Sequence, residues 1–154
     1  MTQTADFEKA HRLATKGDFS FFDDLYHDDF RMERFEIAMN REDYKAVYAS
    51  VSDLRVYGPV RVLFENNQFL CHTVSMRENL GNDVFDFSEI MVASTFKNGQ
   101  VIHQHSVFEK LDSDPSEGQD WNWEDYEWLC SYGLHHRRNQ GEDSGIRSEY
   151  DKGR

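Results

Sequence analysis

Residues 84 to 111 have the pattern of a β-hairpin, which limits the folds that the chain can adopt. Two runs rich in strand-forming residues flank Asn98-Gly99. Asn-Gly is a preferred pair for a two-residue type I′ turn, because both central positions need a positive φ. Such a turn pairs Phe96 with Val101. A three-residue loop with a bulge would instead shift the pairing by one residue and exchange the two faces.

The unshifted register determines which side chains share each face of the hairpin. One face is expected to carry Phe87, Glu89, Met91, Gln104, Ser106 and Phe108. The other is expected to carry Ile90, Val92, Phe96, Val101, His103, His105 and Val107. Neither face has a regular polar pattern, so both should be covered.

The remaining sequence predicts helices followed by strands. Helical spacing runs over residues 6–16, with Thr4 or Asp6 as the cap, and a capping-box pattern begins a short helix at Ser20. Asn40 caps a third helix, and strand-like runs cover residues 30–35, 60–65 and 68–77. Helices before a run of antiparallel strands predict the α+β class.

Composition excludes several kinds of partner. The chain has 154 residues, with 29 acidic and 17 basic side chains and a net charge of −12. This charge repels nucleic acid and anionic membrane, so neither is an expected partner. The N-terminus lacks the basic and apolar regions of a signal peptide, and two cysteines give neither a disulfide framework nor a zinc spacing. A cytoplasmic protein is therefore expected.

The composition changes near Asp112. Residues 112–154 hold 11 acidic and 5 basic residues and begin with a linker-like run, Ser113 to Gly118. Trp121, Trp123 and Trp128 then make the segment too aromatic for an inert tail. We expect a domain over 1–111 and an acidic, aromatic-containing extension over 112–154 that is partly disordered.

Several short motifs, in this order, resemble a known fold. They are Lys16-Gly17-Asp18, His27 to Met32, Asn40-Arg41-Glu42, His72 to Met76 and Asn98 to Val101. Over residues 5–111 the chain resembles the cone-shaped proteins related to nuclear transport factor 2 (NTF2), SnoaL-like polyketide cyclases and ketosteroid isomerase. The resemblance implies a curved, mostly antiparallel sheet wrapped around three N-terminal helices.

The same resemblance does not carry an activity across, because one fold hosts many functions. The positions that match the catalytic tyrosine and two aspartates of ketosteroid isomerase are Ala10, Arg34 and Ala93. SnoaL-like members commonly carry an acid on the last strand, where this chain has Ser106. The known catalytic machineries are therefore absent.

The resemblance also implies a pocket on the concave face of the sheet. Its expected residues are Arg34, His72, Met76, Glu89, Met91, Gln104, Ser106 and Phe108. A carboxylate in apolar surroundings has its charged form disfavoured, which would suit Glu89 to acid–base chemistry with His72. Alternatively Glu89 pairs with Arg34 or lies at a solvated strand end, and His72 is a structural histidine bonded to a neighbouring strand.

Two functional hypotheses follow. In the first, a small-molecule-binding protein acts as a lyase or isomerase, with Glu89 and His72 as catalytic residues. Gln104 and Ser106 would orient a small apolar or aromatic molecule, and Arg34 would bind its carboxylate or enolate. In the second, a non-catalytic binding or dimerisation module has lost the catalytic acids.

Two further expectations concern the outer face. His103 and His105 form an H-x-H pair with Glu109 nearby, but the ligand set is not closed, so we expect no metal and no cofactor. The apolar residues Ile90, Val92, Phe96, Val101 and Val107, together with His105, predict a homodimer through this face. The tryptophan segment is the rival cover.

Overall fold

The computed structural model describes residues 2–127. The helices are α1 (Gln3–Ala14), α2 (Ser20–Leu25) and α3 (Arg41–Val51). The strands are β1 (Tyr26–Arg34), β2 (Ile37–Met39), β3 (Arg55–Asn66), β4 (Phe69–Gly81), β5 (Val84–Lys97) and β6 (Gln100–Leu111). Among the described residues, none of the helices has the length and apolar character needed to span a membrane.

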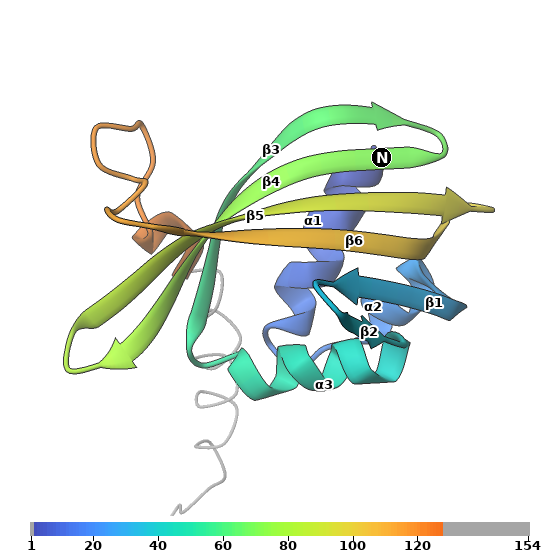
Figure 1. Ribbon diagram of the computed structural model, residues 1–154, viewed down its shortest axis with the longest axis horizontal. Coiled ribbons are helices and arrows are strands. Elements are labelled where there is room, and N and C mark those ends of the chain that lie inside the picture. Colours follow the sequence, from blue (N-terminus) through green and yellow to red (C-terminus); the bar gives the residue numbers. More distant parts are fainter. Residues whose placement is uncertain (1, 128–154) are drawn as a thin grey trace, which may run out of the picture.

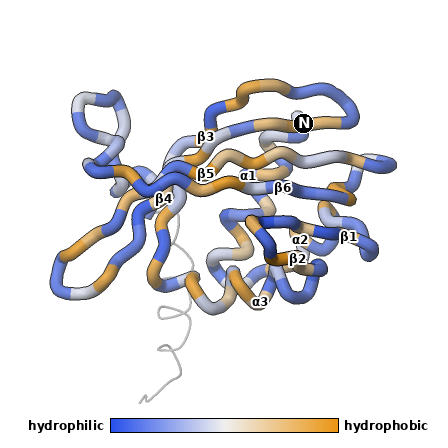
Figure 2. The backbone as a smooth tube through the Cα atoms, in the orientation of Figure 1, coloured by the Kyte–Doolittle hydropathy of each residue, from blue (hydrophilic) through white to orange (hydrophobic). Residues whose placement is uncertain are grey.

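The six strands form one curved sheet in the order β2-β1-β6-β5-β4-β3. Every neighbouring pair is antiparallel except β1 and β6, which run parallel. The three helices pack on one side of the sheet (Figure 1). The expected α+β cone, with a mostly antiparallel sheet around three helices, is confirmed. Hydrophilic residues concentrate at the hairpin turns (Figure 2).

Local sequence explains how α1 and α3 begin. The Thr2 side chain caps α1 by accepting from the Ala5 N–H, so the expected caps at Thr4 or Asp6 are wrong. Asn40 and Asp43 form a reciprocal capping box at the start of α3, as expected. In α2 the cap position is Phe19, which makes no side-chain cap bond, so the predicted capping box is wrong there.

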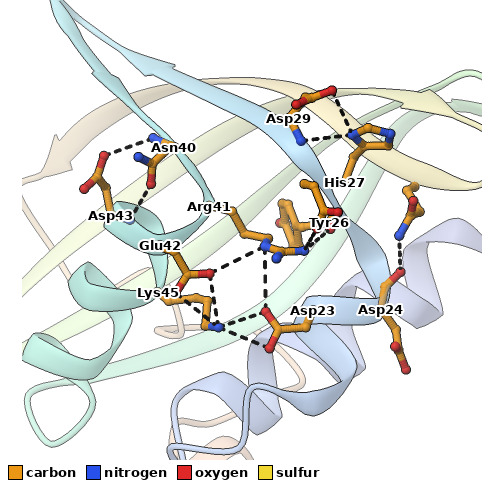
Figure 3. Close-up of polar contacts among 12 residues, drawn as sticks. Asp23, Asp24, Tyr26, His27, Asp29, Asn40, Arg41, Glu42, Asp43 and Lys45 are labelled. Atoms are coloured by element: carbon orange, nitrogen blue, oxygen red, sulfur yellow. Dashed lines mark hydrogen bonds and ion pairs between the residues drawn. The ribbon is translucent and has the colours of Figure 1, made fainter.

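The short α2 has no side-chain cap and is stabilised instead by core packing and by surface ion pairs. Phe22 is fully buried and stacks on Tyr26, with ring centroids 4.1 Å apart. On the surface, Lys45 of α3 donates to Asp23 of α2 at 2.9 Å, while Arg41 donates to the Tyr26 carbonyl at the start of β1 (Figure 3). These contacts fix α2, α3 and β1 relative to one another.

The β5–β6 hairpin has the expected two-residue turn but not the expected register. Asn98 and Gly99 have φ values of 54° and 81°, and Phe96 pairs with Val101. The next pair is Thr95 with His103, so Ile102 is an extra residue on β6. This bulge shifts all later pairs by one residue. The side chains of β5, and Val101 before the bulge on β6, therefore lie on the opposite faces from those predicted, whereas the β6 side chains from His103 onward lie on the predicted faces.

The shifted register changes the outer, solvent-facing side of the sheet. Val92, Phe96 and Val101 are buried in the core, with Ile90 packed against it, so the dimer surface predicted from them is wrong. The exposed apolar side chains on the outer face of β5 and β6 are Met91 and Val107. Association of two copies of the chain stays a prediction. The surface predicted for that association is no longer part of it.

The described part of the tail packs back onto the sheet. Trp123 is buried and lies over Arg77 of β4, with its ring also stacked near Phe87 of β5. Glu127 forms an ion pair with Arg77. β3 runs through Gly58-Pro59, which were expected to precede it, and a Cβ on Gly58 would lie 3.3 Å from Trp121 and Trp123. The expected disorder beyond Arg138 lies outside the described residues.

We expect Gly58→Val to detach this tryptophan segment, because the added methyl groups would occupy the space of two indole rings. Tryptophan fluorescence should shift to longer wavelength, and proteolysis should increase between residues 112 and 127. Gly99→Ala is the control for strain at a glycine away from this segment: its φ of 81° disfavours alanine, but nothing lies within 4 Å of the added Cβ. An unchanged emission spectrum for Gly58→Val would contradict the packing.

Candidate functional site

A cavity of about 100 Å³ lies between α1, α3 and the concave face of the sheet. Its walls are mainly apolar, with contributions from Phe7, Met32, Val74, Ile90 and Val92. The polar side chains on its walls include His11, Arg34, Tyr44, Tyr48, Tyr57, His72 and Ser106. An apolar cavity with a few polar groups is the usual composition of a small-molecule site.

One imidazole on the cavity wall is held by tyrosine hydroxyls. His11 Nε2 lies 2.6 Å from the Tyr26 hydroxyl, and Nδ1 hydrogen-bonds the Tyr48 hydroxyl. Burial, with a smaller effect from His72, lowers the pKa of His11 to about 3. His11 is therefore neutral at pH 7, with one ring nitrogen donating and the other accepting. Both of its polar atoms are used within the protein.

His72 differs from His11 because both of its ring nitrogens lack a partner. It is fully buried, and among the described residues nothing hydrogen-bonds Nδ1 or Nε2. Its ring lies edge-on to Phe7 at 4.5 Å. Burial lowers the pKa of His72 to about 4, so this ring is also neutral at pH 7. The alternative of a structural histidine bonded to a neighbouring strand is therefore wrong.

A second unpaired polar atom lies on the same wall. The Ser106 Oγ is buried and has no hydrogen-bond partner among the described residues. Most buried polar side-chain atoms in folded proteins are hydrogen-bonded, and leaving one unpaired costs roughly 1–3 kcal/mol. Two unpaired groups on one cavity wall indicate a place that binds a polar ligand atom or water.

Arg34 supplies positive charge at the cavity. It comes from the end of β1, and its guanidinium lies over the Phe108 ring at 4.9 Å. No carboxylate of residues 2–127 lies within ion-pair distance of it. Arg12 and Lys16 also line the cavity, where Glu8 is the single acidic residue among its described walls. The cavity is thus locally basic in a chain of net charge −12.

Two predicted site residues lie on the wrong side of the sheet. Glu89 is on the outer face, 38% exposed at its side chain, and its carboxylate lies 3.8 Å from Arg61 rather than near Arg34. Met91 is on the same face and is 43% exposed. Their expected pocket positions are wrong because the bulge at Ile102 shifts the register.

Three others do not line the cavity. Gln104 is fully buried and donates to the Ser94 Oγ at 3.0 Å. Met76 is also buried, and Phe108 lies beneath Arg34. Of the eight predicted residues, the cavity wall contains Arg34, His72 and Ser106.

Solved structures with a similar arrangement share this cone. The alignment with IdmH, a proposed polyketide cyclase from Streptomyces antibioticus, has a TM-score of 0.56 and 8% identity and covers 70% of this chain and 92% of IdmH. An NTF2-like protein of unknown function from Burkholderia pseudomallei aligns with a TM-score of 0.59 and 11% identity, over 71% of this chain and 92% of the other. The chain has an NTF2-like fold.

A third structural alignment is with AclR, a proposed hydroxylase from Streptomyces galilaeus. It has a TM-score of 0.54 and 12% identity and covers 70% of this chain and 78% of AclR. No protein-family model and no curated protein matches the sequence. Identities this low establish the fold alone.

Within the NTF2-like cone, one assigned catalytic position needs correction. Ala93 was matched to the acid on the penultimate strand, but it pairs with His105 on the outer face. The inward-facing neighbours are Val92 and Ser94, both buried. Neither can supply a carboxylic acid, so the ketosteroid isomerase machinery is still absent.

Several residues of the NTF2-like cavity were not predicted. His11, Tyr44, Tyr48 and Tyr57 all line it. His11 follows Phe7 by four residues and therefore lies on the buried face of α1, which is a signal the sequence contains. Tyr44 and Tyr48 were expected as apolar helix positions, and their hydroxyl roles depend on contacts across the core.

Proposed function

We propose that the chain binds a small aromatic or apolar molecule carrying an anionic group, such as a carboxylate, in the cavity of its NTF2-like cone. The observation that carries the proposal is His72, a fully buried imidazole with two unpaired nitrogens on the wall of an apolar cavity. A ligand polar atom bonded to it would remove the desolvation cost of leaving it unpaired. Ser106 offers a second such contact.

Arg34 supports the anionic character of the ligand. It lies on the cavity wall without a carboxylate partner among residues 2–127, and guanidinium binds carboxylate through two parallel hydrogen bonds. Arg12 and Lys16 near the same cavity would raise the local concentration of anions. The structural neighbours IdmH and AclR, proposed as a polyketide cyclase and a hydroxylase, are consistent with a small-molecule ligand.

The test compares benzoate with benzamide, which share a ring and differ in charge. We expect benzoate to bind more tightly to the parent chain, and Arg34→Gln to weaken benzoate by roughly tenfold because a charged hydrogen bond is lost. Binding of benzamide should change little. Titration calorimetry or ligand-observed NMR measures both affinities.

Arg31→Gln is the matched control for this experiment. Arg31 is on the same strand as Arg34 but is exposed and outside the cavity wall. Its loss removes the same charge from the chain without touching the site. If Arg31→Gln and Arg34→Gln weaken benzoate binding equally, the effect comes from the net charge of the chain. That result would contradict the proposed site.

A second candidate is a lyase or isomerase in which His72 moves the proton. A neutral, unpaired imidazole can accept a proton from a bound substrate, which favours His72 over Glu89 for that role. The cavity wall has no acid other than Glu8 among its described residues, which favours binding over acid–base catalysis. Conversion of a bound ligand that is lost in His72→Gln, with its affinity retained, would support the enzyme.

A further inference from the structure

A second cluster of chemically active side chains lies on the outer face of the sheet, away from the cavity. β1 and β6 pair in parallel, and their register places Glu33 opposite His105 and Arg31 opposite His103. His105 Nε2 lies 3.1 Å from Glu33 Oε2, and His103 Nε2 lies 3.5 Å from Glu33 Oε1. One ligand atom from each of the three residues lies within 4.8 Å of the others.

These distances agree with the geometry of a bound divalent metal. Zinc bonds to imidazole nitrogen and carboxylate oxygen are about 2.1 Å long, so tetrahedral ligands lie roughly 3.4 Å apart. The two nitrogen–oxygen separations in the cluster are close to that value. The nitrogen that each imidazole turns toward Glu33 is Nε2, so both rings present a ligand atom toward the same carboxylate.

The neighbouring side chains leave the space around Glu33, His103 and His105 open to solvent. On β5 the residues opposite His103 and His105 are Thr95 and Ala93, which are small. The nearest cation in the register is Arg31, whose guanidinium donates to the Phe30 carbonyl. The side chains of the three ligands are 36%, 58% and 48% exposed for His103, His105 and Glu33, so the remaining coordination positions face solvent.

We propose that Glu33, His103 and His105 bind one divalent transition-metal ion of the zinc type. Two imidazoles and one carboxylate suit zinc, nickel and copper, whereas calcium and magnesium prefer oxygen ligands alone. The ion would connect β1 to β6, the one parallel pair of the sheet. Because it would bind the folded chain and not the separated strands, it would also raise the melting temperature.

The test is titration calorimetry of the metal-free, full-length chain with zinc chloride and nickel chloride. One site is expected, and Glu33→Gln or His105→Ala should weaken it by roughly tenfold or more. The same variants should lose the metal-induced rise in melting temperature. All three side chains are partly or fully exposed, and melting without metal checks that the variants still fold.

Three controls separate this site from others on the chain. Glu109→Gln removes another carboxylate of β6, and His27→Ala removes a β1 histidine that lies 3.9 Å from Asp29. The double variant His135→Ala/His136→Ala removes the adjacent histidines of the tail sequence. All three should keep the affinity of the parent. The proposal is overturned if Glu33→Gln and His105→Ala bind as the parent does, or if the tail variant abolishes binding.

Discussion

His72→Leu is expected to raise the free energy of unfolding at pH 7 by about 1 kcal/mol or more, because it replaces an unpaired buried imidazole with an apolar side chain. The same substitution should reduce the loss of stability in acid. Burial lowers the pKa of His72 from 6.5 to about 4, so the unfolded chain binds the proton more readily than the folded chain. The stability contributed by the neutral form is complete above pH 6.5 and is lost as the pH falls toward 4.

That difference in pKa corresponds to a loss of about 3 kcal/mol in the free energy of unfolding as the pH falls from 6.5 to 4. His11, with a pKa of about 3, acts in the same direction and continues to a lower pH. Urea unfolding at a series of pH values measures the effect, with His27→Leu as the control for removing a histidine. An identical pH dependence in His72→Leu and the parent would show that this imidazole is not buried and neutral.

The opposite signs expected for stability and binding make His72 informative. A residue whose removal stabilises the fold is not there for packing, and active or binding sites are where such costs are found. We expect His72→Leu to weaken benzoate while it raises the melting temperature. Weaker binding together with a lower melting temperature would assign His72 to the core instead.

Phe22→Ala is expected to cause the largest loss of stability, about 3–5 kcal/mol, which approaches the whole stability of many domains. Phe22 is fully buried in a short helix without a side-chain cap and stacks on Tyr26. Its ring also lies within 6.1 Å of the rings of Tyr44 and Tyr48, which line the cavity. The variant should therefore disturb the ligand site as well as the fold.

The neighbouring Phe21 provides the matched control. It is only partly buried and lies against the Lys9 ammonium at 4.1 Å. Phe21→Ala removes the same atoms from the same helix and should cost about 1 kcal/mol. Chemical denaturation of both variants measures the difference. Similar losses for the two would mean that α2 is not anchored by Phe22.

Much of the fold could be predicted from local sequence, because turns and caps are local. Asn98-Gly99 predicts its turn through the backbone angles it tolerates, and Asn40 predicts the start of α3 through its capping bond. The order of these signals also predicted the cone. Of the predicted site, Arg34, His72 and Ser106 lie on the cavity wall.

The tertiary structure decided which face each strand of the hairpin presents. One extra residue, Ile102, moves Glu89 and Met91 outward and Val92 and Phe96 into the core. The local sequence does not show the bulge, because the registers with and without it pair similar residues. Its location depends on which face of the hairpin fits against the helices. The parallel pairing of β1 with β6 is also a long-range contact, and it brings Glu33 to His103 and His105 although about 70 residues separate them.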